Sequence, residues 1–138
     1  MAELVLDQKE RIGAWVAQQV GQGADWGSFY ALGVVRGDEV IAGVVINNFN
    51  GANATCHIAI AYQTKMIIPL FEAVCDYAFR HCGLKRLTGM VPSNEPQVLA
   101  FDKHLGFEEE FLMKDGAPGA DMHILVMRPD TCRWLRKE

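Results

Sequence analysis

The chain has 138 residues and a formal net charge of −4 at pH 7, and this length predicts one domain over residues 1–138. Hydrophobic residues make up 50% and charged residues 22%, which excludes a disordered or low-complexity protein. The acidic balance does not provide the basic face that nucleic acid binding requires, so we expect no nucleic acid partner. The first residues lack the basic region and apolar stretch of a signal peptide, and no apolar stretch approaches the ~20 residues of a membrane span. We therefore expect no membrane contact and a cytoplasmic location.

Four cysteines are spread along the chain without a C-x-x-C pair. They are Cys56, Cys75, Cys82 and Cys132. This spacing predicts neither a zinc site nor a disulfide framework. We therefore expect free thiols in a reducing compartment and no bound metal.

A helix is expected first, over about residues 7–21. Asp7 followed three residues later by Glu10 is a capping-box signature, apolar residues then recur at helical spacing, and Gly21 ends the pattern. The residues that follow are rich in aromatic and β-branched side chains and are interrupted by turn residues, which indicates three consecutive strands. These strands are expected at 26–36, 39–49 and 54–61.

The second half of the chain begins with a change to helical spacing over about residues 66–82, which Gly83 ends. Because this helix is apolar most of the way round, we expect it to be covered on more than one side. A second helix begins at Pro96, a residue typical of a first helical turn. Its buried face is expected to consist of Val98, Phe101 and Leu105. Strands are expected at 85–91, 107–113 and 122–127.

This order predicts an α/β fold with a single mixed, mostly antiparallel central sheet and helices on both faces. The segment 54–91 forms the one parallel βαβ unit, with a right-handed crossover. The flanking hairpins are antiparallel.

The same order, together with residues near its centre, resembles the GNAT family of N-acetyltransferases. The stretch His57-Ile58-Ala59-Ile60 runs into a helix, and a later strand is followed by Asn94, a short helix and Leu105-Gly106-Phe107. The block Cys75 to Phe79 with Gly83 to Arg86 looks like the branch of ribosomal-protein N-terminal acetyltransferases, and especially its small phage-encoded members. The resemblance covers roughly residues 26–135.

The resemblance implies a GNAT-like acyltransferase fold that uses acetyl-CoA as co-substrate. The acetyl group would pass directly, in a ternary complex, to a small-molecule or peptide amine. The backbone of the strand would pair with the pantetheine arm, and the start of the following helix would hold the pyrophosphate. The cofactor-binding residues implied in this way are Ile58, Ala59, Ile60, Gln63, Thr64, Lys65, Met66, Ile67, Asn94 and Phe101.

The pyrophosphate segment departs from the family pattern. Both family glycines are missing, with Met66 and Ile68 in their region, and Pro69 has no amide to offer. Unpaired amides near Thr64 and Lys65 would still favour an anion. Each candidate also has a simpler interpretation: Lys65 as a solvated lysine, Thr64 as a helix cap, and Ser93 or Asn94 as the cap of the helix at Pro96.

Catalytic and acceptor residues are less clearly marked. His57 on the central strand could take the proton of the amine, and a hydrogen-bonded structural role is the alternative. At the place of the family's tyrosine acid the chain has Asp102, which if ionised would not protonate a leaving thiolate. The acceptor would contact Trp26, Tyr30, Asn47 and Asn48, although clustered asparagines are also typical of turns.

Other interpretations of the sequence stay open. A catalytically inert GNAT-fold protein could bind acyl-CoA or a protein partner without turnover. An unrelated α/β interaction module could use helix 66–82 as its partner surface. A covalent relay through Cys56 or Cys82 has no basic partner in the sequence to support it. Exposed sheet edges at 107–127 are compatible with a homodimer.

Overall fold

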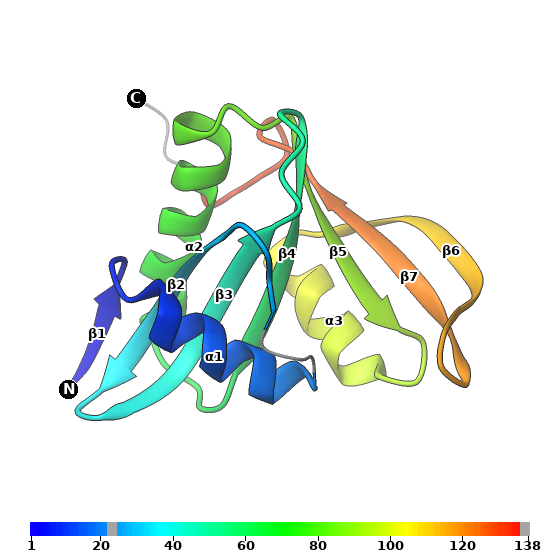
Figure 1. Cartoon of the computed structure of the whole chain (residues 1–138). Coiled ribbons are helices and arrows are strands. Elements are labelled where there is room, and N and C mark those ends of the chain that lie inside the picture. Colours follow the sequence, from blue (N-terminus) through cyan, green and yellow to red (C-terminus); the bar gives the residue numbers. More distant parts are fainter. Residues whose placement is uncertain (22–24, 136–138) are drawn as a thin grey trace.

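The computed structural model describes residues 1–21 and 25–135. Its elements are β1 (Ala2–Val5), α1 (Lys9–Val20), β2 (Phe29–Arg36), β3 (Glu39–Asn47), β4 (Asn53–Ile60), α2 (Ile67–Cys75), the π-helical segment η1 (Asp76–His81), β5 (Arg86–Pro92), α3 (Pro96–Leu105), β6 (Glu108–Ala117) and β7 (Ala120–Met127). The strands form one sheet in the order β1-β2-β3-β4-β5-β7-β6 (Figure 1). Only β4 and β5 pair in parallel among these strands, so the expected mixed sheet with one βαβ unit is confirmed.

The helices cover the two faces of the sheet. On one face, Ile12 and Val16 of α1 pack in a cluster with Val45 of β3. On the other face, α2 and α3 contribute Phe71 and Leu105 to a larger cluster. The contact of α1 with the sheet depends on a missing side chain, because a Cβ at Gly43 would lie 2.7 Å from Val16 Cγ2. Helices on both faces are therefore confirmed.

The N-terminal region differs from the prediction in two ways. The strand β1 was not expected; it is four residues long and is held by antiparallel pairing with β2. The predicted capping box is wrong, because α1 begins at Lys9 after Gln8, with no side-chain hydrogen bond at its cap. The predicted end is confirmed, since Gly21 caps α1 with a φ of 75°.

The strands keep their predicted order but change their bounds. Strand β2 starts at Phe29, and the preceding Trp26 is a buried loop residue. Strand β3 ends at Asn47, because Asn48 has a left-handed φ of 56°. Strands β6 and β7 are longer than expected and pair across a tight connection at Pro118 and Gly119, with register shifts that bend the hairpin.

The predicted helix 66–82 is present as α2 and η1 together. The change to π geometry closes with a hydrogen bond from Cys82 N to Tyr77 O, five residues back. The segment after β7, residues 128–135, is called the C-terminal segment here. It covers a second side of this helix, with the rings of Phe71 and Trp134 centred 6.1 Å apart. The cover is incomplete, since Ile68 stays 54% exposed.

Helix α3 begins at Pro96, as predicted, but its cap and its buried face differ. The residue at the N-cap is Glu95, so neither Ser93 nor Asn94 caps the helix. Val98 is 39% exposed, whereas Asp102, on the same helix, is only 7% exposed. The expected face was wrong at Val98 because that side of the helix borders a cavity and not the sheet.

The cysteines are free thiols in the structure. Two of them, Cys75 of α2 and Cys132 of the C-terminal segment, lie with their Sγ atoms 2.9 Å apart. This contact joins residues far apart in the sequence, and their spacing gave no sign of it. None of the helices in the described ranges is long and apolar enough to cross a membrane.

Candidate active site at the open end of the sheet

The parallel strands β4 and β5 pair only where they begin. The paired residues are Asn53 with Arg86, Ala54 with Leu87 and Thr55 with Thr88. Farther along, β4 stays bonded to β3 as far as Ile60, and β5 stays bonded to β7 as far as Pro92. We call residues 53–55 with 86–88 the paired end and residues 56–60 with 89–92 the open end. The two strands meet at the top of Figure 1 and diverge downward.

A cavity of about 510 Å³ lies at the open end. Its walls include residues 56–60 of β4, residues 90–92 of β5, and Val98 and Asp102 of α3. A second cavity of about 340 Å³ shares two residues each of β4 and α3 with the first and extends to Gln63 and Phe101. The open end therefore presents strand backbone and one face of α3 to a space that can take an elongated ligand.

Asp102 lines both cavities. Its Oδ1 is buried and has no hydrogen-bond partner. Among the residues that the structure describes, 1–21 and 25–135, it is the one buried side-chain oxygen or nitrogen in this condition. Burial penalises the carboxylate and raises the pKa of Asp102 to about 7. The carboxyl group is therefore partly protonated near neutral pH, unlike the ionised aspartate considered from the sequence.

His57 lies in the wall of the larger cavity and is held by Asn47. Its Nε2 is 2.9 Å from Asn47 Oδ1, and Asn47 Nδ2 donates a hydrogen bond of 3.2 Å to Trp26 O. Because the Asn47 amide nitrogen is committed to a carbonyl, its oxygen is the acceptor, so His57 Nε2 carries the proton and Nδ1 keeps its lone pair. Burial lowers the pKa of His57 to about 4, which leaves the ring neutral at neutral pH.

The other candidate acceptor residues lie in different surroundings. Trp26 is 5% exposed, donates from Nε1 to Gly13 O at 2.8 Å, and stands 4.7 Å from the His57 ring, so it supports His57 from the core. Tyr30 stacks on Tyr77 with ring centres 4.1 Å apart, and its hydroxyl donates to Leu6 O. Asn48 is exposed in the turn after β3. The structure brings Asn47 and Trp26 to His57 but does not bring Tyr30 there.

The candidate cofactor residues lie in three places. Ile58, Ala59, Ile60, Gln63 and Phe101 line the two cavities. Asn94 lines neither of these but a third hollow of about 320 Å³ at the start of α3, which shares Glu95 and Val98 with the larger cavity. Thr64 and Lys65 lie in the turn before α2, where Lys65 is exposed.

The backbone amides at the start of α2 already have partners. Met66 N donates to Thr64 Oγ1 at 3.2 Å, and the amides of Ile67 and Ile68 donate to the carbonyls of Thr64 and Lys65 at 3.3 and 3.4 Å. Pro69 has no N–H. The sequence predicted unpaired amides here. A diphosphate bound at this helix start would have to replace these long turn bonds.

No protein-family model and no curated protein matches the chain. Solved structures do match. A spermidine N-acetyltransferase from Vibrio cholerae in complex with CoA and spermine has a TM-score of 0.69 and 12% identity, over 94% of this chain and 96% of that chain. A point mutant of the spermidine N-acetyltransferase SpeG from Vibrio cholerae has a TM-score of 0.72 and 12% identity, over 98% and 96% of the two chains. A dodecameric structure of the Vibrio cholerae enzyme has a TM-score of 0.70 and 13% identity, over 92% and 93%.

These likenesses cover nearly the whole of both chains at low identity. They are therefore evidence of architecture and not of shared chemistry. The mixed sheet, its single parallel pair and the helices on both faces are common to this chain and its neighbours. The chain has the GNAT acetyltransferase fold.

Proposed function

We propose that the protein is an acetyl-CoA-dependent N-acetyltransferase that transfers the acetyl group directly to a primary amine. The observation that carries the proposal is the separation of β4 from β5 over a cavity in a GNAT fold. Backbone groups of Ile58, Ala59 and Ile60 at this edge could pair with the amides of a pantetheine arm, as an added strand would. Gln63 and Phe101 would border the same ligand in the adjoining cavity.

The acceptor side of the site would be the part of the larger cavity near His57. A neutral amine must attack the thioester carbonyl and then lose a proton. His57 Nδ1 has a lone pair for that proton, and Asn47 holds the ring in the necessary tautomer. The low pKa of His57 makes it a weak base, so we assign it a transient role in passing the proton to solvent.

Polyamines are the first acceptors to test, because fold neighbours are described as spermidine N-acetyltransferases and one holds spermine. A net charge of −4 would favour a polycationic acceptor in solution. Peptide N-termini come second, on the sequence resemblance to ribosomal-protein N-terminal acetyltransferases and their phage-encoded members.

We also propose a cytoplasmic location and a single domain over residues 1–138.

A homodimer through β6 is part of the proposal. This strand is at the edge of the sheet and exposes three consecutive large side chains. They are Phe111, Leu112 and Met113, which are 61%, 44% and 40% exposed. An edge strand of this kind favours pairing with a second copy, and a fold neighbour is described as dodecameric.

A second candidate is an acyl-CoA-binding protein without turnover. It is favoured by the low pKa of His57, about 4, which makes the candidate base of the site a weak one. The exposed Lys65 would be a candidate cation for the diphosphate of the bound ligand.

The first experiment is a calorimetric titration of the full chain with acetyl-CoA, followed by a thiol-release assay over a panel of spermidine, spermine, lysine and short peptides. Binding with thiol release on any acceptor supports the enzyme, and binding without release supports the second candidate. Absence of binding at millimolar acetyl-CoA would rule out both.

The placement of the ligand is tested by blocking the cavities. Val98→Trp puts an indole where the two cavities meet, on a residue exposed enough to accept it. We expect acetyl-CoA binding to fall at least tenfold while the thermal transition is kept. Leu6→Trp, at a 43% exposed position outside both cavities, is the matched control. Equal binding by the two variants would show that the ligand lies elsewhere. Lys65→Ala and Asn94→Ala then test the phosphate contacts.

A further inference from the structure

We propose that the Asp102 carboxyl group is the acid that protonates the leaving thiolate, an inference that rests on the proposed acetyl transfer. The geometry points to Asp102 because it borders both cavities, where the thioester would lie between the pantetheine space and the acceptor space. Its Oδ1 is buried and, within the described part of the chain, has no hydrogen-bond partner. Buried polar atoms are nearly always paired, so the unpaired oxygen is an exception in the part of the chain that the structure describes, and it belongs to a residue that lines both cavities.

The chemical step requires one proton at sulfur. The amine nitrogen attacks the carbonyl carbon, a C–N bond forms, and the C–S bond breaks with its electron pair going to sulfur. Asp102 gives its proton to that sulfur, so coenzyme A leaves as a thiol and Asp102 becomes a carboxylate. The nitrogen loses one proton to solvent, and Asp102 takes one back from solvent before the next turnover. The sum is amine plus thioester giving amide plus thiol.

The surroundings of Asp102 favour the protonated form of its carboxyl group. No lysine or arginine is among the described residues that line either cavity, so no cation is there to stabilise a carboxylate. Three other titratable groups of residues 1–21 and 25–135 face the same space. They are the Cys56 thiol and the His57 ring of β4, and the carboxylate of Glu95, the residue that precedes α3. Burial raises the pKa of the Cys56 thiol, so it stays neutral, and the His57 ring is neutral as well.

A carboxyl group in this place could instead be the counter-ion of a cationic acceptor. The two roles differ in what they require, because a counter-ion must be ionised and an acid must be protonated. Burial favours the protonated form and puts the pKa of Asp102 at about 7, well above that of an ordinary aspartate. The apolar neighbours Val98 and Phe101 on the same helix add no partner for an anion. The acid role is therefore the better supported of the two.

The test is Asp102→Asn in the full chain, with the acceptor that gives thiol release in the wild-type protein. Asparagine has nearly the same shape and no acidic proton, so we expect kcat to fall at least 100-fold, with little change in acetyl-CoA affinity or in KM for the amine. The wild-type kcat should decline as pH rises through the pKa of Asp102, and the residual rate of the variant should lack that decline. Asp130→Asn, at an exposed position after β7, controls for the substitution itself.

Three outcomes would overturn the proposal. Wild-type kcat and pH profile in Asp102→Asn would leave Asp102 with no role in proton transfer. A raised KM for the amine with unchanged kcat would make it a counter-ion for the acceptor. Loss of acetyl-CoA binding in a folded variant would make it a structural wall of the cavity. Asp102→Ser gives the same measurements if the asparagine variant does not fold. A wild-type protein that releases no thiol would instead contradict the proposed function.

Discussion

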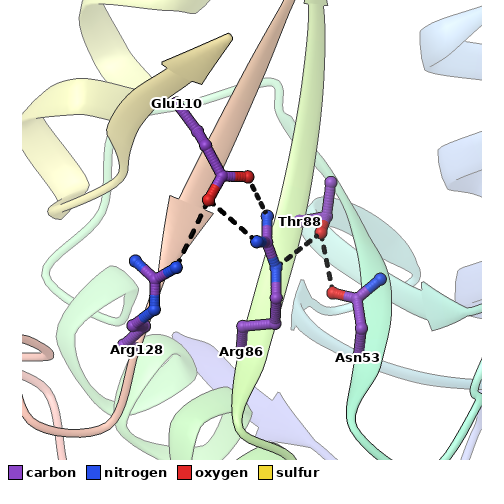
Figure 2. A network of polar contacts seen from close by, with 5 residues as sticks. All are labelled: Asn53, Arg86, Thr88, Glu110 and Arg128. Carbon is purple, nitrogen blue, oxygen red and sulfur yellow. Dashed lines mark hydrogen bonds and ion pairs between the residues drawn. The ribbon is translucent and has the colours of Figure 1, made fainter.

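The two ends of the β4–β5 pair are built from opposite kinds of polar contact. At the paired end, Asn53 Oδ1 accepts a hydrogen bond of 2.7 Å from Thr88 Oγ1, and Arg86 Nε reaches the same hydroxyl (Figure 2). Glu110 of β6 completes the network, 2.8 Å from Arg86 and 3.3 Å from Arg128. These contacts lower the pKa of Glu110, with the hydrogen bond from Arg86 as the largest cause. Each charged group in this network has an opposite partner.

At the open end the balance is reversed. Asp102 is buried without a partner for Oδ1, and the partly buried His57, which bonds to Asn47, has its charged form disfavoured. Burying ionisable groups without an opposite charge is costly, so folding disfavours the charged form of both groups. The paired end therefore stabilises the register of the two strands, whereas the open end carries ionisable groups that have no opposite charge beside them.

The largest expected effect comes from opening the paired end. Leu87 of β5 is fully buried beside Ala54, so Leu87→Ala should lower the free energy of unfolding by about 2–5 kcal/mol. Met90, three residues along the same strand, is 46% exposed in the cavity wall, so Met90→Ala should cost less than about 1 kcal/mol. Urea denaturation of the two variants measures the difference. Equal losses would mean that the open end is packed as tightly as the paired end.

The next effect is the pH dependence of stability in Asp102→Asn. The pKa of Asp102 is raised from 3.8 to about 7 on folding, so the folded state holds the proton more tightly and wild-type stability is lost as pH rises from about 4 to 7. At about 1.4 kcal/mol per pH unit, the loss approaches about 4 kcal/mol. The asparagine variant should therefore gain stability over wild type as pH rises, measured by urea denaturation from pH 4 to 8. Asp130→Asn should keep the wild-type profile, and a constant difference between Asp102→Asn and wild type would contradict the burial cost.

A third effect, of opposite sign, is expected from His57→Gln. Folding lowers the pKa of His57 from 6.5 to about 4, so the unfolded chain takes up the proton first and stability is lost as pH falls through this range. The limit is about 3 kcal/mol, and between pH 4 and 6.5 it opposes the contribution of Asp102. Glutamine can still donate to Asn47 Oδ1 but cannot become charged, so His57→Gln should grow more stable relative to wild type on acidification. His104→Gln, exposed on α3, is the control. Parallel profiles for His57→Gln and wild type would show that the ring is solvated.

Much of the fold could be predicted from the sequence because local signals mark it. Glycines with positive φ end α1 and α3, the helical spacing after residue 66 is strong, and the strand order follows from the short connections. The missed strand β1 has only four residues and depends on pairing with β2, which no local pattern records. The π turn in η1 and the Cys75–Cys132 contact likewise depend on tertiary packing.

The candidate site was less predictable, for a geometric reason. The sequence marked His57 and the residues 58–60 of β4, and these do line the cavity. It could not show that β4 and β5 separate after three residue pairs, because that depends on register and sheet twist. Asp102 was noticed from the family pattern but not its burial or its missing partner, which arise only when α3 closes the cavity. The helical spacing wrongly predicted a buried Val98, because spacing does not show which side of α3 borders a cavity.

The smallest expected effect comes from the network of Figure 2. Arg86→Ala removes both bonds to Glu110 and the contact with Thr88, yet Glu110 keeps Arg128, and its carboxylate is exposed enough for water to replace the lost donor. Exposed ion pairs add little to stability and are screened by salt, so the loss should be far smaller than for Leu87→Ala and should shrink further at high salt. Arg128→Ala is the matched control, because it removes one cation from the same carboxylate and leaves β5 unchanged. Urea denaturation at low and high salt measures both variants. A large, salt-independent loss confined to Arg86→Ala would show that the bond from Arg86 to Thr88 is what holds the paired end together, and that the ion pairs only surround it.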